Sequence, residues 1–175
     1  MPGESLANLV ERLQTICLER GLTVSTAESC TGGLIAELIT ARAGSSAYFH
    51  GGIVSYSNQA KVELLGVRGE ELAAHGAVSA QVARSMAIGA RVRLATDLAV
   101  SITGIAGPDG GTPAKPLGLT YVAVADAAAA DVRRFVWSGD RAANREAGAR
   151  AALELLIERV SAVPATPAPA EAGEA

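Results

Sequence analysis

Two segments rich in hydroxyl groups each join a short apolar run to a helical pattern. The first, TAESCTGG at 26–33, follows the run 22–26, and the second, YSNQAK at 56–61, follows the run 51–56. Short β-branched runs are typical of strands, and apolar residues three and four apart are typical of helices. The pattern predicts a layered α/β fold. In such a fold the strand-to-helix turns gather at one edge of the sheet, so residues about thirty positions apart converge on one crevice.

The remaining apolar patterns complete a single α/β unit. The run 98–103 is almost entirely apolar, as expected of a central strand covered on both faces. The runs 119–125 and 132–137 are typical of a hairpin, which would make the sheet mixed. We therefore expect a three-layer α/β/α sandwich with a mixed, mostly parallel sheet of about five strands. Helices are expected from Leu6 to a stop at Gly21, around 34–39, between a cap at Asn58 and a stop at Gly66, around 82–90 after a cap at Ser79, and up to Val160 after a cap at Asp140.

Length and composition favour one folded domain. The chain has 175 residues, of which 49% are hydrophobic but only 3% are aromatic, so a core of Ala, Val, Leu and Ile is expected. The predicted domain covers 1–160. Residues 161–175 are mainly Ala, Pro, Glu and Thr without periodicity, and this composition predicts a disordered tail.

Charge and cysteine usage exclude several classes of function. A net charge of −3 argues against nucleic acid or an anionic membrane as a partner. The N-terminal segment is polar and no uncharged run approaches the length of a membrane span, so a cytoplasmic location is expected. Cys17 and Cys30 lack the spacing of metal ligands, and His50 and His75 have no nearby partner. We expect no disulfide, no metal and no cofactor.

Ser29, Lys61 and Tyr56 are the candidate catalytic residues. Ser29 is expected at a helix start, where it is either a cap or a nucleophile beside amides that hold an oxyanion. Lys61 is either a solvated surface residue or, when half-buried, a base with a lowered pKa that takes the Ser29 proton. Tyr56 is either a core residue whose hydroxyl reaches solvent or a second proton-transfer group.

Other residues near the predicted crevice leave alternatives open. Cys30 is either a small buried hydrophobe or an activated thiol that Glu28 and Lys61 would complete as a Glu-Lys-Cys hydrolase set. The glycine-rich loop at 103–111 is either a plain turn or a backbone that approaches a phosphate or ribose. Arg141 and Arg145 are either solvated charges or phosphate clamps, and Arg141 is favoured because it is closer to the helix start.

Several motifs follow one another along the chain: AESCTGG at 27–33, GSS at 44–46, YSNxAK at 56–61, GAVS at 76–79, TGIAGP at 103–108 with KP at 115–116, and GDR at 139–141. This ordered series resembles the CinA C-terminal domain family over about 5–160. One departure is LGL at 117–119, where the family more often has valine followed by Gly-Thr.

The resemblance implies an activity: deamidation of nicotinamide mononucleotide to nicotinate mononucleotide and ammonia, without metal, in pyridine-nucleotide recycling. It further implies a homodimer or larger homo-oligomer. Ser29 would be the nucleophile, Lys61 its general base and Tyr56 an assistant in proton transfer. The alternative is a non-catalytic nucleotide-binding regulatory module. Thr31, Gly32 and Gly33 would supply donors to the oxyanion, and Ser46, Ser57, Thr103, Gly104, Ile105, Ala106 and Arg141 would line the nucleotide pocket.

Overall fold

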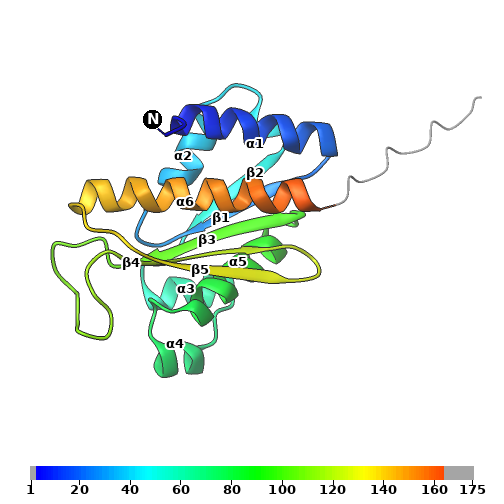
Figure 1. The fold of residues 1–175 in the computed structure, drawn as a ribbon. Helices are drawn as coiled ribbons and strands as arrows, with labels where there is room; N and C mark the ends of the chain where they lie inside the picture. Colours follow the sequence, from blue (N-terminus) through cyan, green and yellow to red (C-terminus); the bar gives the residue numbers. More distant parts are fainter. Residues whose placement is uncertain (1–2, 164–175) are drawn as a thin grey trace, which may run out of the picture.

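A five-stranded mixed sheet forms the middle layer of the computed structural model, which describes residues 3–163 (Figure 1). The strand order is β2-β1-β3-β4-β5. β1 pairs in parallel with β2 and β3, whereas β4 is antiparallel to β3 and β5. The predicted α/β fold, its hairpin and its mixed sheet are confirmed. The strands are β1 Val24–Glu28, β2 Phe49–Val54, β3 Leu98–Gly104, β4 Leu119–Ala125 and β5 Ala130–Val136.

Helices cover both faces of this sheet, as Figure 1 shows. On one face α6 crosses β3 and β4 and packs against α1. On the other face α5 crosses β1, β3, β4 and β5, and α3 and α4 pack against α5. The first face carries α1 Leu6–Arg20, α2 Leu34–Thr40 and α6 Arg141–Ala162, and the second carries α3 Asn58–Leu65, α4 Gly69–His75 and α5 Ala80–Arg93.

Short polar and glycine residues set the helix ends. The prediction that Asn58 caps the third helix was wrong: the Ser57 hydroxyl accepts the Ala60 amide at 3.0 Å, and Asn58 is the first helical residue. Asp140 caps α6, as predicted. Neither α4 nor the 3₁₀ turn η1 (Ser45–Ala47) was predicted, because such short elements show too little periodicity.

The interior is aliphatic, as the composition predicted. Large side chains such as Leu13, Ile102 and Leu156 fill the space between the sheet, α1 and α6. On the opposite face, small residues such as Ala83 and Ala87 of α5 meet Ala123 of β4. Small side chains let a helix pack close to a sheet, and α5 packs in this way against β4. The outer side of α5 contacts α3.

The end of the predicted domain is close to the observed end of the last helix. α6 continues through Ser161 and Ala162, the first two residues of the predicted tail. Residues 164–175 lie outside the described residues, and disorder there stays a prediction. Among residues 3–163, no helix is both long enough and apolar enough to cross a membrane.

The contact between α3 and α5 depends on Gly89. A Cβ atom added at this position would lie 2.0 Å from the Leu65 carbonyl oxygen at the end of α3. No real Cβ approaches a backbone oxygen so closely, so a side chain at Gly89 would push α3 away. The absence of a side chain at Gly89 therefore sets the depth at which α3 sits.

We predict that Gly89→Ala destabilises the fold. Overpacking of this kind costs about 1–3 kcal/mol, which exceeds the gain of up to about 1 kcal/mol from better helix propensity. Gly69→Ala, in the first turn of α4, is the matched control because a Cβ there meets nothing within 4 Å. Chemical denaturation should show a loss of stability for Gly89→Ala only; equal stability of the two variants would contradict this packing account.

Candidate active site

The Ser29 hydroxyl and the Lys61 amine meet at the carboxyl edge of the sheet. Ser29 directly follows β1, and Lys61 lies in the first turn of α3, which follows the neighbouring parallel strand β2. The Lys61 side chain is fully enclosed, with 1% exposure, and its Nζ lies 2.9 Å from the Ser29 Oγ. The predicted convergence of these two strand-to-helix turns is therefore present in the structure.

The partners of the Lys61 Nζ suit a neutral amine. The nitrogen lies 2.6 Å from the Ser55 carbonyl oxygen and 3.4 Å from the Tyr56 carbonyl oxygen. A neutral amine has two hydrogens, which these carbonyls can accept, and its lone pair is then free for the Ser29 hydroxyl proton. An ammonium has three donors, and the same three oxygens can accept them. The geometry therefore fits both sides of a proton transfer from Ser29 to Lys61.

Burial also favours the neutral form of Lys61. Removal from water disfavours the ammonium and lowers the pKa of Lys61 below its ordinary value of 10.5, while the nearby Cys30 acts in the opposite direction. In the part of the chain that the structure describes, no carboxylate pairs with Lys61. Apart from the opposing effect of Cys30, the desolvation of the charged form is therefore offset by neutral acceptors within the described residues.

A cavity of about 200 Å³ opens beside the pair. Part of its wall was not predicted: Ala77 and Val78, which precede α5, also line the cavity. Those residues belong to GAVS at 76–79, which was named only as part of the resemblance. Predicted residues that line the cavity are Ser29, Tyr56, Lys61, Thr103, Gly104, Ala106 and Arg141, joined by Cys30, Ala77 and Val78.

The turn after Ser29 differs from the one expected. Ser29 does not begin a helix, because α2 starts at Leu34 with Gly33 as its cap. The Gly32 amide already donates to the Ser29 carbonyl at 3.1 Å, and the Gly33 amide donates to the Glu28 carboxylate at 3.1 Å. These two predicted oxyanion donors are therefore engaged within the protein.

Thr31 and Cys30 complete the inventory of donors in this turn. Thr31, the third predicted donor, is fully buried, and its hydroxyl has no partner among the described residues. Cys30 does line the cavity, and its backbone amide lies against its own thiol with no other acceptor in the described chain. The Thr31 amide likewise has no acceptor there. The amides of Cys30 and Thr31 are therefore the candidate oxyanion donors, and Cys30 is favoured because it lines the cavity.

The rival Glu-Lys-Cys set is not assembled. The buried Glu28 carboxylate accepts the amides of Gly33, Ile35 and Ala36, so it serves the start of α2 instead of a thiol. Burial raises the pKa of the Cys30 thiol to about 11. A thiol with so high a pKa is protonated near neutral pH and is a poor nucleophile.

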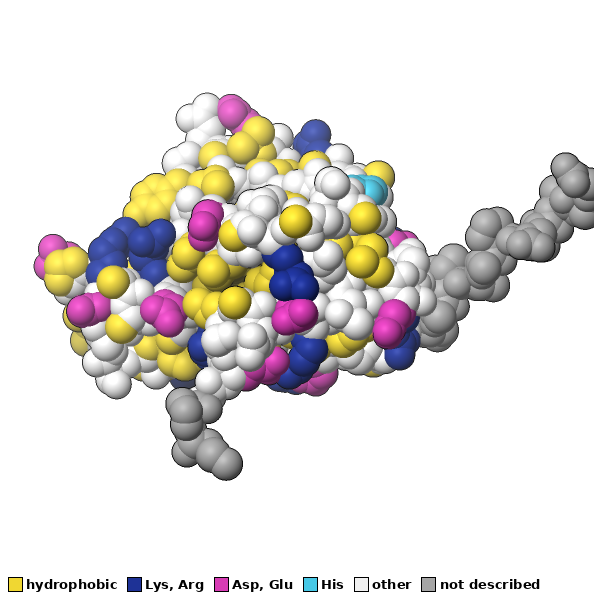
Figure 2. Space-filling model, turned by 90° about the horizontal axis from the view of Figure 1, so that it is seen from above, with side chains coloured by type: hydrophobic (Ala, Val, Ile, Leu, Met, Phe, Trp, Pro, Cys, Tyr) yellow, Lys and Arg dark blue, Asp and Glu magenta, His cyan; other side chains and the backbone are white. Residues whose placement is uncertain are grey.

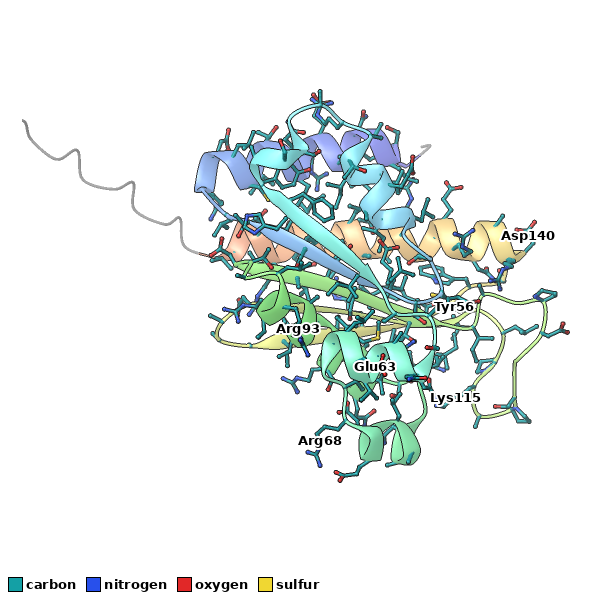
Figure 3. The ribbon with its side chains drawn as sticks, turned by 180° about the vertical axis from the view of Figure 1, so that it is seen from behind. Tyr56, Glu63, Arg68, Arg93, Lys115 and Asp140 are labelled. Carbon is teal, nitrogen blue, oxygen red and sulfur yellow. The ribbon has the colours of Figure 1, made fainter. Side chains whose placement is uncertain are left out.

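Tyr56 lies at the mouth of the cavity, apart from the proton-transfer pair. Its side chain is 64% exposed, and its hydroxyl oxygen accepts from Arg141 Nη2 at 3.3 Å. Figure 3 shows Tyr56 at the same end of the molecule as Asp140, at the start of α6, and Lys115, in the loop after β3. The structure gives its hydroxyl no hydrogen bond to Ser29 or Lys61, so a role at the cavity entrance fits it better than proton transfer.

Three other predicted pocket residues lie outside the cavity lining. Ser46 is exposed and precedes β2, whereas the cavity lies beyond the other end of that strand; six strand residues separate the two by roughly 20 Å. Ser57 is committed to capping α3. Ile105 pairs through its backbone with Leu119 and Gly118. Within one copy of the chain, Ser46 lies away from the cavity, and its role in nucleotide binding stays a prediction.

The first two turns of α6 hold the other walls of the site. Arg141 donates to the Gly107 carbonyl at 2.7 Å, and buried Asn144 donates to the Ala106 carbonyl at 3.0 Å. Arg145 binds the carbonyls of Cys30 and Thr31. Figure 2 shows Lys and Arg side chains gathered at the end of the molecule where α6 begins. Of the two arginines weighed from sequence, Arg141 lines the cavity and Arg145 does not.

The fold and this site define an α/β protein with a serine placed for nucleophilic chemistry by a buried lysine. The model of the CinA C-terminal domain matches residues 6–160, and the chain belongs to that family. The nicotinamide-nucleotide amidohydrolase PncC of Escherichia coli K12 is 50% identical over 160 residues, which cover 91% of this chain and 97% of PncC.

Longer relatives and a solved structure agree with this assignment. A CinA-like protein of Citrifermentans bemidjiense is 55% identical over 79% of this chain, and the match covers 34% of that protein's length. The chain thus spans about a third of such relatives. A competence/damage-inducible protein of Agrobacterium tumefaciens, 44% identical, has a TM-score of 0.86 over 90% of this chain and 97% of its own.

The described residues contain no cluster of side chains suited to metal binding. Between residues 3 and 163, no three His, Cys, Asp or Glu side chains lie close enough together to hold an ion. The polar groups at the cavity are a hydroxyl, an amine, a phenol, a guanidinium and backbone amides, which are suited to proton transfer and anion binding.

We predict that Cys30 resists alkylation in the native protein. The pKa of its thiol is raised from 9.0 to about 11, so at pH 8 the thiolate fraction falls about a hundredfold below that of an ordinary cysteine. Mass spectrometry after iodoacetamide treatment should show slow labelling of Cys30 in the native state and fast labelling after denaturation. Fast native labelling would return Cys30 to the list of nucleophiles.

Proposed function

We propose that the protein is a nicotinamide-nucleotide amidohydrolase that converts nicotinamide mononucleotide and water to nicotinate mononucleotide and ammonia. The observation that carries the proposal is the 2.9 Å contact between the Ser29 Oγ and the Lys61 Nζ beside a cavity. The identity to E. coli PncC over nearly the full length of both chains supports the substrate. Arg141, at the cavity mouth, is the proposed ligand of the phosphate.

In the first half-reaction the neutral Lys61 amine takes the proton of the Ser29 hydroxyl. The Oγ forms a bond to the carboxamide carbon, and the carbonyl oxygen becomes an oxyanion that the Cys30 amide can hold. The C–N bond then breaks, and the Lys61 ammonium returns its proton to the departing nitrogen, which leaves as ammonia. The product is an ester between Ser29 and the pyridine carbonyl.

In the second half-reaction Lys61 serves as the base for water. The amine removes a proton from a water molecule, whose oxygen attacks the ester carbon. The bond to the Ser29 Oγ breaks, and the Lys61 ammonium gives the proton back to that oxygen. Ser29 and Lys61 return to their starting forms, and one carboxylic acid is released, which ionises at neutral pH.

Ammonia release tests the proposal against a binding module without catalysis. The purified protein should release ammonia from nicotinamide mononucleotide, and Ser29→Ala should lower kcat by more than about 10³-fold with little change in nucleotide affinity. Cys30→Ala is the matched neighbour and should keep most of its activity. Tight nucleotide binding without ammonia would instead favour a regulatory module.

The rate should rise with pH through the pKa of Lys61. Below that pKa the ammonium cannot accept the Ser29 proton, and above it the neutral amine can, so kcat/KM should climb to a plateau. Because burial lowers the pKa of Lys61, the inflection should fall below 10.5. A pH–rate profile of the wild type and of Lys61→Met checks this, since the residual activity of the variant should lose the inflection. An unchanged inflection in Lys61→Met would assign it to another group.

Cellular context belongs to the same proposal. A small nucleotide substrate, a place in pyridine-nucleotide recycling and a cytoplasmic location follow from the proposed reaction. A homodimer or larger homo-oligomer is proposed on the family resemblance. Analytical ultracentrifugation of the purified protein measures the oligomeric state directly.

A further inference from the structure

Arg145 binds the backbone of the turn that follows Ser29. Its Nε donates to the Cys30 carbonyl at 3.2 Å, and its Nη2 donates to the Thr31 carbonyl at 2.8 Å. Over residues 3–163, this half-buried guanidinium forms no ion pair with a carboxylate. Its hydrogen-bonding capacity toward the protein is therefore directed at the turn.

Two carbonyls held by one planar group fix two successive peptide units. Because a peptide unit is planar, holding the Cys30 carbonyl also fixes the direction of the Thr31 amide on the opposite side of the unit. The same argument applies to the Thr31 carbonyl and the Gly32 amide, which donates to the Ser29 carbonyl at 3.1 Å. The fork geometry of a guanidinium suits this paired contact, and a lysine ammonium lacks it.

The same turn is held on its other sides by β3 and by the Glu28 carboxylate. The Ser29 amide donates to the Ile102 carbonyl at 3.0 Å, and Glu28 accepts the Gly33 amide. Arg145 supplies the third support, from α6. When that support is removed, the turn between Ser29 and Gly32 keeps its two ends but loses the contacts that orient its middle.

We propose that Arg145 is a positioning residue that keeps the Ser29 hydroxyl in line with the Lys61 amine. This inference rests on the proposed function and separates the two arginines of α6 by role. Arg141 lines the cavity and faces the substrate, whereas Arg145 faces the turn and is absent from the cavity wall. Arg145 therefore affects the chemical step through Ser29 and makes no contact with the phosphate.

Steady-state kinetics of matched arginine variants test the proposal. A displacement of the nucleophile by about 1 Å costs about 10²-fold in rate, so Arg145→Ala should lower kcat by about 10²-fold with KM for nicotinamide mononucleotide within about twofold. Arg145→Lys should fall between the wild type and Arg145→Ala. Arg141→Ala should mainly raise KM.

Arg150 provides the control on the same helix. Its guanidinium also binds a backbone carbonyl, that of Glu4, but far from the cavity. Arg150→Ala should lose stability without a change in kcat. Thermal unfolding of each variant separates loss of the fold from loss of positioning. If Arg145→Ala does not fold, the kinetics of Arg145→Lys provide the test.

Two further readouts distinguish positioning from a general structural role. Guanidinium chloride at about 20 mM should restore part of the kcat of Arg145→Ala, and the same concentration of sodium chloride should not, because the free cation can refill the donor site. The rate at which phenylmethanesulfonyl fluoride labels Ser29, followed by mass spectrometry, should fall about 10²-fold in Arg145→Ala.

The labelling arm keeps this inference separate from the proposed function. A wild type that releases no ammonia but labels at Ser29 refutes the proposed reaction, and slow labelling of Arg145→Ala then still supports positioning. An unchanged kcat and labelling rate in Arg145→Ala would overturn the inference, as would a raised KM with unchanged kcat. A wild-type Ser29 that neither turns over substrate nor labels would overturn both.

Discussion

The site depends on the cost of burying an amine without a carboxylate beside it. Lys61 is enclosed between α3 and the ends of β1 and β2, where its nitrogen has, over residues 3–163, one hydroxyl and two carbonyl oxygens as hydrogen-bond partners. Neutral acceptors solvate an ammonium less well than water does, so the neutral form is favoured. In the proposed reaction, this one constraint lets a residue that is normally a surface cation serve as the base for the adjacent Ser29.

The rest of the fold holds this pair in place through backbone contacts. Gly89 lets α3 sit close to α5 and so sets the depth of Lys61. The buried Glu28 carboxylate binds amides at the start of α2. The half-buried Arg145 guanidinium binds carbonyls in the turn between β1 and α2. Two charges of opposite sign therefore hold the segment around Ser29. Both charges are satisfied by main-chain dipoles, and neither lies in the cavity wall, which keeps the wall available to a substrate.

Periodicity and topology made the fold and the central pair predictable from sequence. Strand-to-helix turns at one sheet edge brought Ser29 near Lys61 without any detailed geometry. Side-chain direction was not predictable in this way. Glu28 could serve a thiol or a helix start, and only the structure shows it at the amides of α2. Ser46 was carried over by motif alone, and in one copy of the chain it lies before β2, at the end of the strand opposite the cavity, so its role stays a prediction.

The proposed reaction requires the Lys61 amine to be neutral at a pH where an ordinary lysine is charged. Heteronuclear NMR of protein labelled with ¹⁵N at lysine side chains follows the Nζ of Lys61 directly, with Lys61→Arg used to assign its signal. The Nζ should titrate with a pKa below the ordinary value of 10.5, because burial disfavours the ammonium. A titration at or above 10.5 would mean that Lys61 stays charged and cannot be the base for Ser29.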